Sequence, residues 1–184
     1  MTTASASIST GSQTVGPYFR IGLEHLLDCA PALVADGENF ILIQGILLDG
    51  DRKPVPDAVL EFWASGHEGS WAVNGFPPGF RRVPTDAEGR FFMTIERPAA
   101  VTVDGTPEQA PHLAVAIFMR GLLRHLLTRV YLADEAALSS DPVLNAIPSH
   151  RRATLFAQPD FASRGAYHWD VTLQGELETV FFAW

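Results

Sequence analysis

The sequence predicts a mainly β protein: an antiparallel β-sandwich with long loops and one or two short helices. Three observations carry this prediction. Short runs of apolar and β-branched residues recur along the chain, turn-forming residues separate them, and few segments have the spacing of an amphipathic helix. The 184 residues, 47% of them hydrophobic and 18% charged, suit one compact domain. We therefore expect a single domain over residues 13–184, preceded by a flexible N-terminal arm over residues 1–12.

The expected strands follow one another from residue 40 onward. Each is a mostly apolar run of β-forming residues that ends near glycine, proline or aspartate. These runs cover residues 40–48, 58–63, 90–95, 112–119, 126–132 and 179–184. From Tyr167 to Gln174 apolar and polar residues alternate, which predicts an antiparallel strand with one buried face.

The segments between the strands are predicted to be loops and short helices. Residues 64–84 are rich in glycine and proline, and a loop of this length in a compact domain usually carries function or covers an interface. Residues 134–138 suit a short helix that Pro142 would stop, and residues 149–156 suit another.

Composition excludes several classes of partner. The 13 lysines and arginines against 21 aspartates and glutamates give a net charge of −8, which argues against nucleic acid and anionic membrane surfaces. Cys29 is the only cysteine, so an intrachain disulfide is impossible and a reducing compartment is expected. The N-terminus lacks the pattern of a signal peptide, and the apolar run over residues 40–48 is too short to span a bilayer. A cytoplasmic location is therefore expected.

No familiar catalytic motif is present. The chain lacks a glycine-rich phosphate loop, a Gly-x-Ser-x-Gly elbow and a His-Glu-x-x-His pair. No two histidines stand two residues apart, the spacing that places two imidazoles on one face of a strand. The histidines are His25, His67, His112, His125, His150 and His168. His112, at the start of an expected strand, is then a hydrogen-bonded residue rather than a ligand. Arg120, at the end of that strand, is either solvated or a cation at the edge of a cavity.

Seven stretches carry a resemblance to a known family. They are residues 12–18 (Ser-Gln-Thr-Val-Gly-Pro-Tyr), 60–64, 85–91, 110–112 (Ala-Pro-His), 118–126, 128–131 and 174–182. The last stretch ends in Glu-Thr-Val-Phe-Phe. In this order, and over nearly the whole chain, they resemble the intradiol ring-cleaving dioxygenases. Within that family they are most similar to the alpha subunits of the branch that cleaves protocatechuate.

The resemblance implies a heteromeric enzyme. A catalytic beta subunit of similar fold would hold a ferric ion, Fe(3+), through two tyrosines and two histidines. The complex would cleave protocatechuate with O2 between its two hydroxyls to give 3-carboxy-cis,cis-muconate. Alpha–beta heterodimers would assemble further, and this chain alone would be inactive.

The family's metal-binding motif is altered here. Catalytic subunits carry Arg-Pro-x-His-x-His, whereas residues 109–114 read Gln-Ala-Pro-His-Leu-Ala. His112 keeps the first histidine position and Ala114 replaces the second. The two tyrosine positions fall near Trp71 and near Val101. The resemblance thus implies that His112 is a vestigial ligand position and that this chain binds no metal, since one imidazole cannot replace four ligands.

The resemblance also implies what the chain contributes instead. Alpha subunits of the family extend their N-terminal arm to the substrate pocket of the beta subunit. The matching substrate-binding residues are Thr14, Gly16, Pro17 and Arg120. Thr14 could equally be an ordinary turn hydroxyl, and Tyr18 and Phe19 are expected to anchor the arm at the subunit interface.

The sequence leaves three alternative roles of the chain open. The chain could be a purely structural subunit that lines no part of an active site. It could be a β-sandwich binding module of the transthyretin-like kind. It could also be a self-sufficient metalloenzyme whose site the sequence does not reveal.

Overall fold

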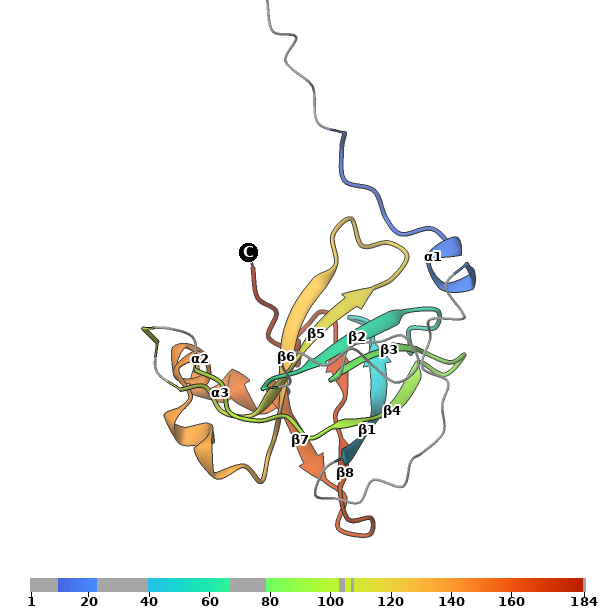
Figure 1. The fold of residues 1–184 in the computed structure, drawn as a ribbon. Helices are drawn as coiled ribbons and strands as arrows, with labels where there is room; N and C mark the ends of the chain where they lie inside the picture. The colour runs from blue at the N-terminus through green and yellow to red at the C-terminus, as the bar shows by residue number, and fades with distance from the viewer. Residues whose placement is uncertain (1–9, 23–39, 67–78, 103–104, 107, 184) are drawn as a thin grey trace, which may run out of the picture.

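The computed structural model describes residues 10–22, 40–66, 79–102, 105–106 and 108–183, and in this part the chain is mostly β (Figure 1). This confirms the expected fold class. The division into an arm and one domain at residue 12 stays a prediction, because residues 1–9 lie outside the described part.

Loops and a few short helices join the strands. The strands are β1 (Phe40–Leu48), β2 (Val59–Ala64), β3 (Phe80–Pro84), β4 (Arg90–Glu96), β5 (His112–Phe118), β6 (Leu126–Leu132), β7 (Phe156–Pro159), β8 (Ala166–His168) and β9 (Val171–Thr172). The α-helices are α1 (Tyr18–Ile21), α2 (Pro142–Ala146) and α3 (Ser149–Arg152), and two 3-10 turns cover Ala136–Ser140 and Ala153–Leu155.

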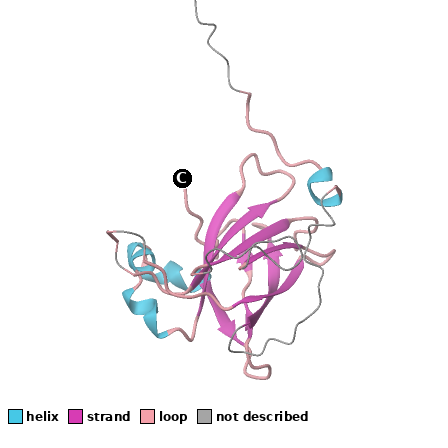
Figure 2. Cartoon of the chain, viewed as in Figure 1, coloured by secondary structure: helices cyan, strands magenta, loops and turns pink. Residues whose placement is uncertain are grey.

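The strands form two facing layers. They are hydrogen-bonded in the order β3-β2-β5-β6-β7-β8-β1-β4, with β9 on β1, and this curled sheet folds back on itself (Figure 2). The core lies between the two halves, where Phe62 of β2 contacts the rings of Phe91 and Trp169 from the opposite half. The arrangement places the C-terminal end of β5, the start of β6 and the N-terminal segment at one end of the molecule (Figure 1).

β1 shows how the sequence encodes this burial. Its side chains alternate between buried and half-buried, with Ile41, Ile43 and Leu47 fully enclosed. Gly45 lies in the same buried row. The position suits only glycine, because a Cβ there would approach the carbonyl oxygen of Trp169 to 1.8 Å. The alternation continues in the tail, where Tyr167, Trp169, Val171 and Leu173 are all buried.

The pairing of that tail differs from the expectation. β8 runs parallel to β1 and antiparallel to β7, and β9 also runs parallel to β1. The prediction of a simple antiparallel strand therefore holds for the pairing with β7 but is wrong for the pairing with β1, and its burial pattern holds except at Thr172, which is also buried. Alternation reports which face is buried, but it does not report the direction of the neighbouring strand.

Three other expectations need correction. β3 lies inside the predicted loop over residues 64–84, and Arg82 on it pairs with Glu61 of β2. Residues 179–183 form no regular strand; they are bonded to the sheet through a bridge between Leu127 and Phe182 and through hydrogen bonds of Thr179 with Thr172 and of Val180 with Thr128. Pro142 starts a helix instead of stopping one, because proline suits the first helical position and the Asp141 side chain accepts a hydrogen bond from the N–H of Leu144 at 2.8 Å.

Within the described residues, no helix has the length and apolar character needed to cross a membrane.

Candidate functional site

The N-terminal segment, residues 10–22, is fixed to the end of β5 and to the hairpin that follows it. From here on, the arm means residues 10–22, which overlap the arm predicted over residues 1–12 only in part, and the hairpin means residues 119–125. The Thr14 hydroxyl accepts a hydrogen bond from the N–H of Gly121 at 2.8 Å and donates one to the carbonyl of Met119 at 3.5 Å. Gly121 has φ 94°, a left-handed conformation that favours glycine. Thr14 is therefore more than a local turn hydroxyl.

Gly16 and Pro17 form the turn that leads into α1. The carbonyl of Gly16 accepts from the N–H of Phe19 at 3.0 Å, and the carbonyl of Pro17 accepts from Arg20 and Ile21. Pro17, with φ −60°, already has the backbone angle that a helix start needs. A Cβ added to Gly16 would meet nothing within 4 Å. Within the described residues, therefore, nothing requires glycine at position 16.

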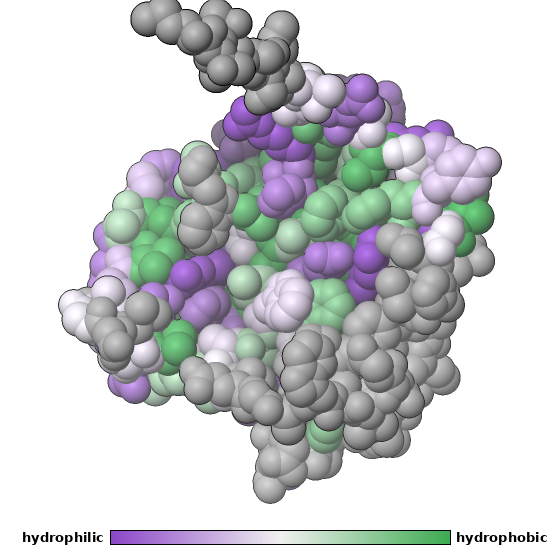
Figure 3. Space-filling view, turned by 45° about the horizontal axis from the view of Figure 1, so that its top comes forward, coloured by the Kyte–Doolittle hydropathy of each residue, from purple (hydrophilic) through white to green (hydrophobic). Residues whose placement is uncertain are grey.

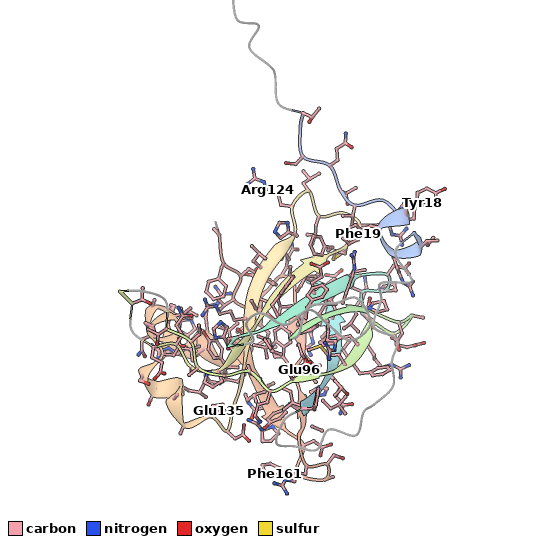
Figure 4. The ribbon with its side chains drawn as sticks, viewed as in Figure 1. Tyr18, Phe19, Glu96, Arg124, Glu135 and Phe161 are labelled. Carbon is pink, nitrogen blue, oxygen red and sulfur yellow. The ribbon has the colours of Figure 1, made fainter. Side chains whose placement is uncertain are left out.

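Phe19 anchors the arm to its own domain. Its ring lies 5.0 Å from the ring of Phe118, and the guanidinium of Arg82 lies 4.5 Å from its centroid on another side. Tyr18, in contrast, points away from the domain and is 79% exposed (Figure 4). The two aromatic residues thus differ: Phe19 packs on its own sheet, whereas Tyr18 is available to a neighbour.

Charged groups meet beside this turn. Asp57 pairs with Arg20 of the arm through Oδ1 and with Arg120 through Oδ2, the second pair at 3.3 Å. The side chain of Arg120 is 63% exposed. Sequence reasoning identified Arg120 but missed Asp57 and Arg20, because their pairing spans 37 and 63 residues of chain and leaves no local signal.

A small cavity lies at the centre of these groups, and we call it the arm site. It has a volume of about 120 Å³ and is lined by Val15, Gly16, Pro17, Phe19, Arg20, Ile21, Asp57, Phe118 and Arg120. The structure thus brings Gly16, Pro17 and Arg120 together, with Thr14 holding the adjoining hairpin. Pockets that enclose a small ligand usually have about 300–1,000 Å³. The arm site is smaller than such a pocket.

His112 lies in a different place, in the interior. It is buried, and its Nδ1 is 2.8 Å from the carbonyl of Ala110, so Nδ1 carries a proton and donates. Burial lowers its pKa below the usual 6.5, and the charge of Arg129 acts in the same direction. His112 is thus a neutral, hydrogen-bonded residue, as the sequence suggested.

The surroundings of His112 do not suit a ferric ion. Ala114, on the same face of β5, offers no donor atom, and its register partner on β6 is Arg129, a cation. The Arg129 guanidinium donates to Gln109 at 2.8 Å and lies 3.3 Å from the hydroxyl of Tyr131. Burial raises the pKa of Tyr131 to about 12, which opposes the phenolate that iron would require.

No other group of donors compensates within the described residues. They contain no cluster of three or more histidine, cysteine, aspartate or glutamate side chains that could hold a metal. Trp71, near one of the expected tyrosine positions, lies outside the described residues. Val101, near the other, forms an isolated β-bridge with Gln109 and offers only an apolar side chain.

The sequence matches one protein family, described as Dioxygenase, over residues 16–175. Among curated proteins it is 43% identical to the protocatechuate 3,4-dioxygenase alpha chain of Burkholderia cepacia, over 94% of this chain and 96% of that one. It is 35% identical to the alpha chain of the same enzyme from Pseudomonas putida, over 94% and 95% of the two chains. The beta chain of the Burkholderia cepacia enzyme is more distant, at 28% identity over 92% of this chain and 77% of that one.

Solved structures support the fold. The dioxygenase domain of a carbohydrate-binding fusion protein from Streptomyces sp. SirexAA-E superposes with a TM-score of 0.54 at 20% identity, over 85% of this chain and 86% of that one. Catechol 1,2-dioxygenase from Pseudomonas arvilla C-1 gives a TM-score of 0.56 at 21% identity, over 82% of this chain and 55% of that one. At this level of identity the likeness concerns the fold alone.

Proposed function

Since this chain belongs to the intradiol ring-cleaving dioxygenase family, we propose that it is the alpha subunit of a heteromeric protocatechuate 3,4-dioxygenase. It pairs with a beta subunit that holds Fe(3+), and these pairs assemble further. The observation that carries the proposal is the 43% identity to an alpha chain of that enzyme over almost the full length of both chains. The complex cleaves protocatechuate with O2 to 3-carboxy-cis,cis-muconate, and this chain by itself binds no iron.

In this proposal the chain supplies one wall of the partner's substrate pocket. The iron of the beta subunit activates the diol, and the residues of this chain bind and orient the ring. Gly16 and Pro17 present a bare backbone and an apolar ring toward the opening. The open space beside Gly16 supports close approach by a group from outside the chain.

Arg120 is the residue that meets the substrate's carboxylate. Protocatechuate carries this group on the ring, away from the diol, and it is ionised at neutral pH. A guanidinium with exposed N–H groups can donate to it, and the apolar lining of the cavity strengthens that interaction. In a chain of net charge −8, a local cation also raises the concentration of anionic substrate at this point.

The surface around the arm site suits a protein partner. Tyr18 and Ile21 of the arm and Leu123 of the hairpin are large apolar side chains with 79%, 57% and 63% of their surface exposed. Beside them a hollow of about 660 Å³ is lined mainly by apolar residues of the hairpin, β6 and the C-terminal segment. Apolar side chains also gather below the N-terminal segment on the face in Figure 3. Such surface is typical of a site that a second subunit covers.

The test is assembly with an iron-bearing beta subunit. Co-expression should give a stable complex that consumes O2 with protocatechuate, whereas this chain alone should show no turnover. Replacing Arg120 by Ala in the complex should lower kcat/KM for protocatechuate about tenfold, through loss of a charged hydrogen bond, and should spare uncharged catechol. Arg90→Ala is the matched control, because Arg90 is similarly exposed, pairs with Asp86 and Glu88, and lines neither the arm site nor the adjoining hollow.

The alternatives give other results in the same experiments. A purely structural subunit would form the complex, but Thr14→Ala and Arg120→Ala would leave turnover and KM unchanged. A transthyretin-like binding module would form no complex with a beta subunit. Stoichiometric iron in the isolated chain would show a self-sufficient metalloenzyme. A cytoplasmic location is part of the proposal and is supported by the single cysteine.

A further inference from the structure

Asp57 joins two arginines that come from distant parts of the chain. One carboxylate oxygen pairs with Nη1 of Arg20 on the arm, and the other lies 3.3 Å from Nη2 of Arg120 at the end of β5. The sequence separations are 37 and 63 residues. A single carboxylate therefore links the arm to the strand end that carries the proposed substrate cation.

The arm site has an uneven charge balance. Arg20, Asp57 and Arg120 are the charged members of the described lining, and the other lining residues are Val15, Gly16, Pro17, Phe19, Ile21 and Phe118. Two guanidinium groups and one carboxylate leave one net positive charge. Because the remaining walls are apolar, that charge is screened less than it would be on an open surface.

The two arginines are not equivalent. The side chain of Arg20 is 36% exposed, and its Nε is buried without a hydrogen-bond partner. The side chain of Arg120 is 63% exposed and keeps N–H groups open to a ligand. Asp57 thus offsets one of the two guanidinium charges, and Arg120, although its Nη2 pairs with Asp57, is the more accessible of the two cations.

Contacts within the domain fix the backbone around Asp57. Asp57 has φ 61°, a left-handed conformation that aspartate, asparagine and glycine tolerate better than other residues. The next residue, Ala58, donates its N–H to the buried Thr85 hydroxyl at 2.9 Å, and that hydroxyl donates to the carbonyl of Val55 at 2.9 Å. These bonds hold the backbone next to Asp57 independently of the two arginines.

We propose that Asp57 sets the charge selectivity of the arm site. By cancelling one of two arginine charges, it adapts the site to a ring that bears a single carboxylate. An uncharged ring gains nothing from Arg120, and a ring with two carboxylates brings one negative charge more than the cluster balances, close to Asp57 itself. This inference rests on the proposed function, since it names the residue that selects among catechols in the same site.

The test compares three ortho-diols on the assembled complex: catechol, 3,4-dihydroxybenzoate (protocatechuate) and 4,5-dihydroxyphthalate, which carry zero, one and two carboxylates. The binding constant of each is measured as KM, or as the inhibition constant against 3,4-dihydroxybenzoate. Asp57→Asn removes one charge and keeps a residue that tolerates positive φ. We expect it to improve binding of the dicarboxylate about tenfold relative to the monocarboxylate. This is the effect of removing the repulsion between two unit charges several ångströms apart, here Asp57 and the second carboxylate. Catechol should change by less than about twofold, because a ring without charge does not respond to that removal.

Two further variants complete the design. Asp51→Asn removes the same charge from the exposed turn where Asp51 pairs with Lys53, outside the arm site. It should leave unchanged the ratio of the two binding constants, that of the dicarboxylate to that of the monocarboxylate. Asp57→Gly suits the left-handed backbone without any side chain and should shift the ratio as Asp57→Asn does. An unchanged ratio in the Asp57 variants would overturn the inference. So would an equal loss for all three rings, or complexes that fail to assemble, since each means that Asp57 serves the scaffold alone.

Failure of this inference is distinguishable from failure of the proposed function. If Arg120→Ala leaves the binding of 3,4-dihydroxybenzoate unchanged, the arm site does not meet the substrate and both ideas fall. If Arg120→Ala weakens that binding but Asp57→Asn leaves the ratio as it is, only the charge selectivity is wrong.

Discussion

Thr14 and Gly121 are hydrogen-bonded to each other across 107 residues of sequence, with 2.8 Å between the threonine hydroxyl oxygen and the glycine N–H. This bond fixes the arm before any partner is present. It also places Gly16 and Pro17 beside the residue that precedes Gly121, which is Arg120. The geometry of the arm site is thus largely set within one chain.

Replacing Thr14 by Val should loosen the arm without changing its shape. Valine has the same branching but no hydroxyl, so the N–H of Gly121 and the carbonyl of Met119 would turn to water. A bond of this kind contributes about 0.5–1.5 kcal/mol, so KM for protocatechuate should rise about two- to tenfold in the complex. Thr14→Ser keeps the hydroxyl and serves as the control. Equal KM values for valine and wild type would show that the bond does not position the site.

Gly121→Ala and Gly16→Ala should differ sharply. Gly121 has φ 94°, so alanine there should cost about 1–2 kcal/mol and lower the thermal midpoint of the complex by several degrees. A Cβ at position 16 meets none of the described residues within 4 Å, so alanine there should leave that midpoint unchanged. If the proposed pocket is right, Gly16→Ala should instead raise KM, because the added methyl faces the ligand. Steady-state kinetics and thermal melting of both variants separate the two effects.

Phe19→Ala should weaken the attachment of the arm, whereas Tyr18→Ala should not. The Phe19 ring covers Arg82, whose Nε and Nη2 are buried without hydrogen-bond partners, and it packs on Phe118. Losing a partly buried aromatic ring and its cation–π contact should cost about 2 kcal/mol. Limited proteolysis of the arm in the isolated chain measures this directly. Faster cleavage in Tyr18→Ala than in Phe19→Ala would contradict the assignment.

Much of the fold follows from the sequence because it is encoded locally. The apolar runs at residues 40–48 and 126–132 coincide with β1 and β6. β3 was missed because Arg81 and Arg82 interrupt the apolar pattern, and their partners Glu96 and Glu61 lie on other strands. Residues 179–184 resemble a strand in composition, but the described residues 179–183 form only an isolated β-bridge, at Phe182, and no regular ladder. Arg120 was found through family resemblance, whereas Asp57 could be recognised only from the folded chain.

The stability of the complex should fall at mildly acidic pH through His112. Burial lowers the pKa of His112 in the folded chain below its usual 6.5, so the unfolded chain takes up a proton at a higher pH than the folded chain does. The contribution of neutral His112 is fully present above about pH 6.5 and is lost as the pH falls from there toward the folded-state pKa. His112→Asn keeps a donor toward the Ala110 carbonyl and cannot titrate, so the thermal midpoint should depend less on pH between about 7 and 5. His150→Asn, at an exposed position, should keep the wild-type slope, and an unchanged slope in His112→Asn would refute the assignment.

Restoring the second histidine should not create an iron site in this chain. Ala114→His would place two imidazoles on one face of β5, the spacing that a metal pair needs. The guanidinium of Arg129 stands opposite position 114, however, and would repel a ferric ion, while the Tyr131 phenol, with a pKa of about 12, resists the ionisation that an anionic ligand requires. We therefore expect iron analysis of the complex to give one ion per alpha–beta pair in both wild type and Ala114→His. An additional ferric ion in Ala114→His, with its own electron paramagnetic resonance signal, would show that the missing imidazole alone separates this chain from a metal-binding one. Adding Arg129→Gln to Ala114→His removes the cation, and comparing the two variants separates charge repulsion from the lack of anionic ligands.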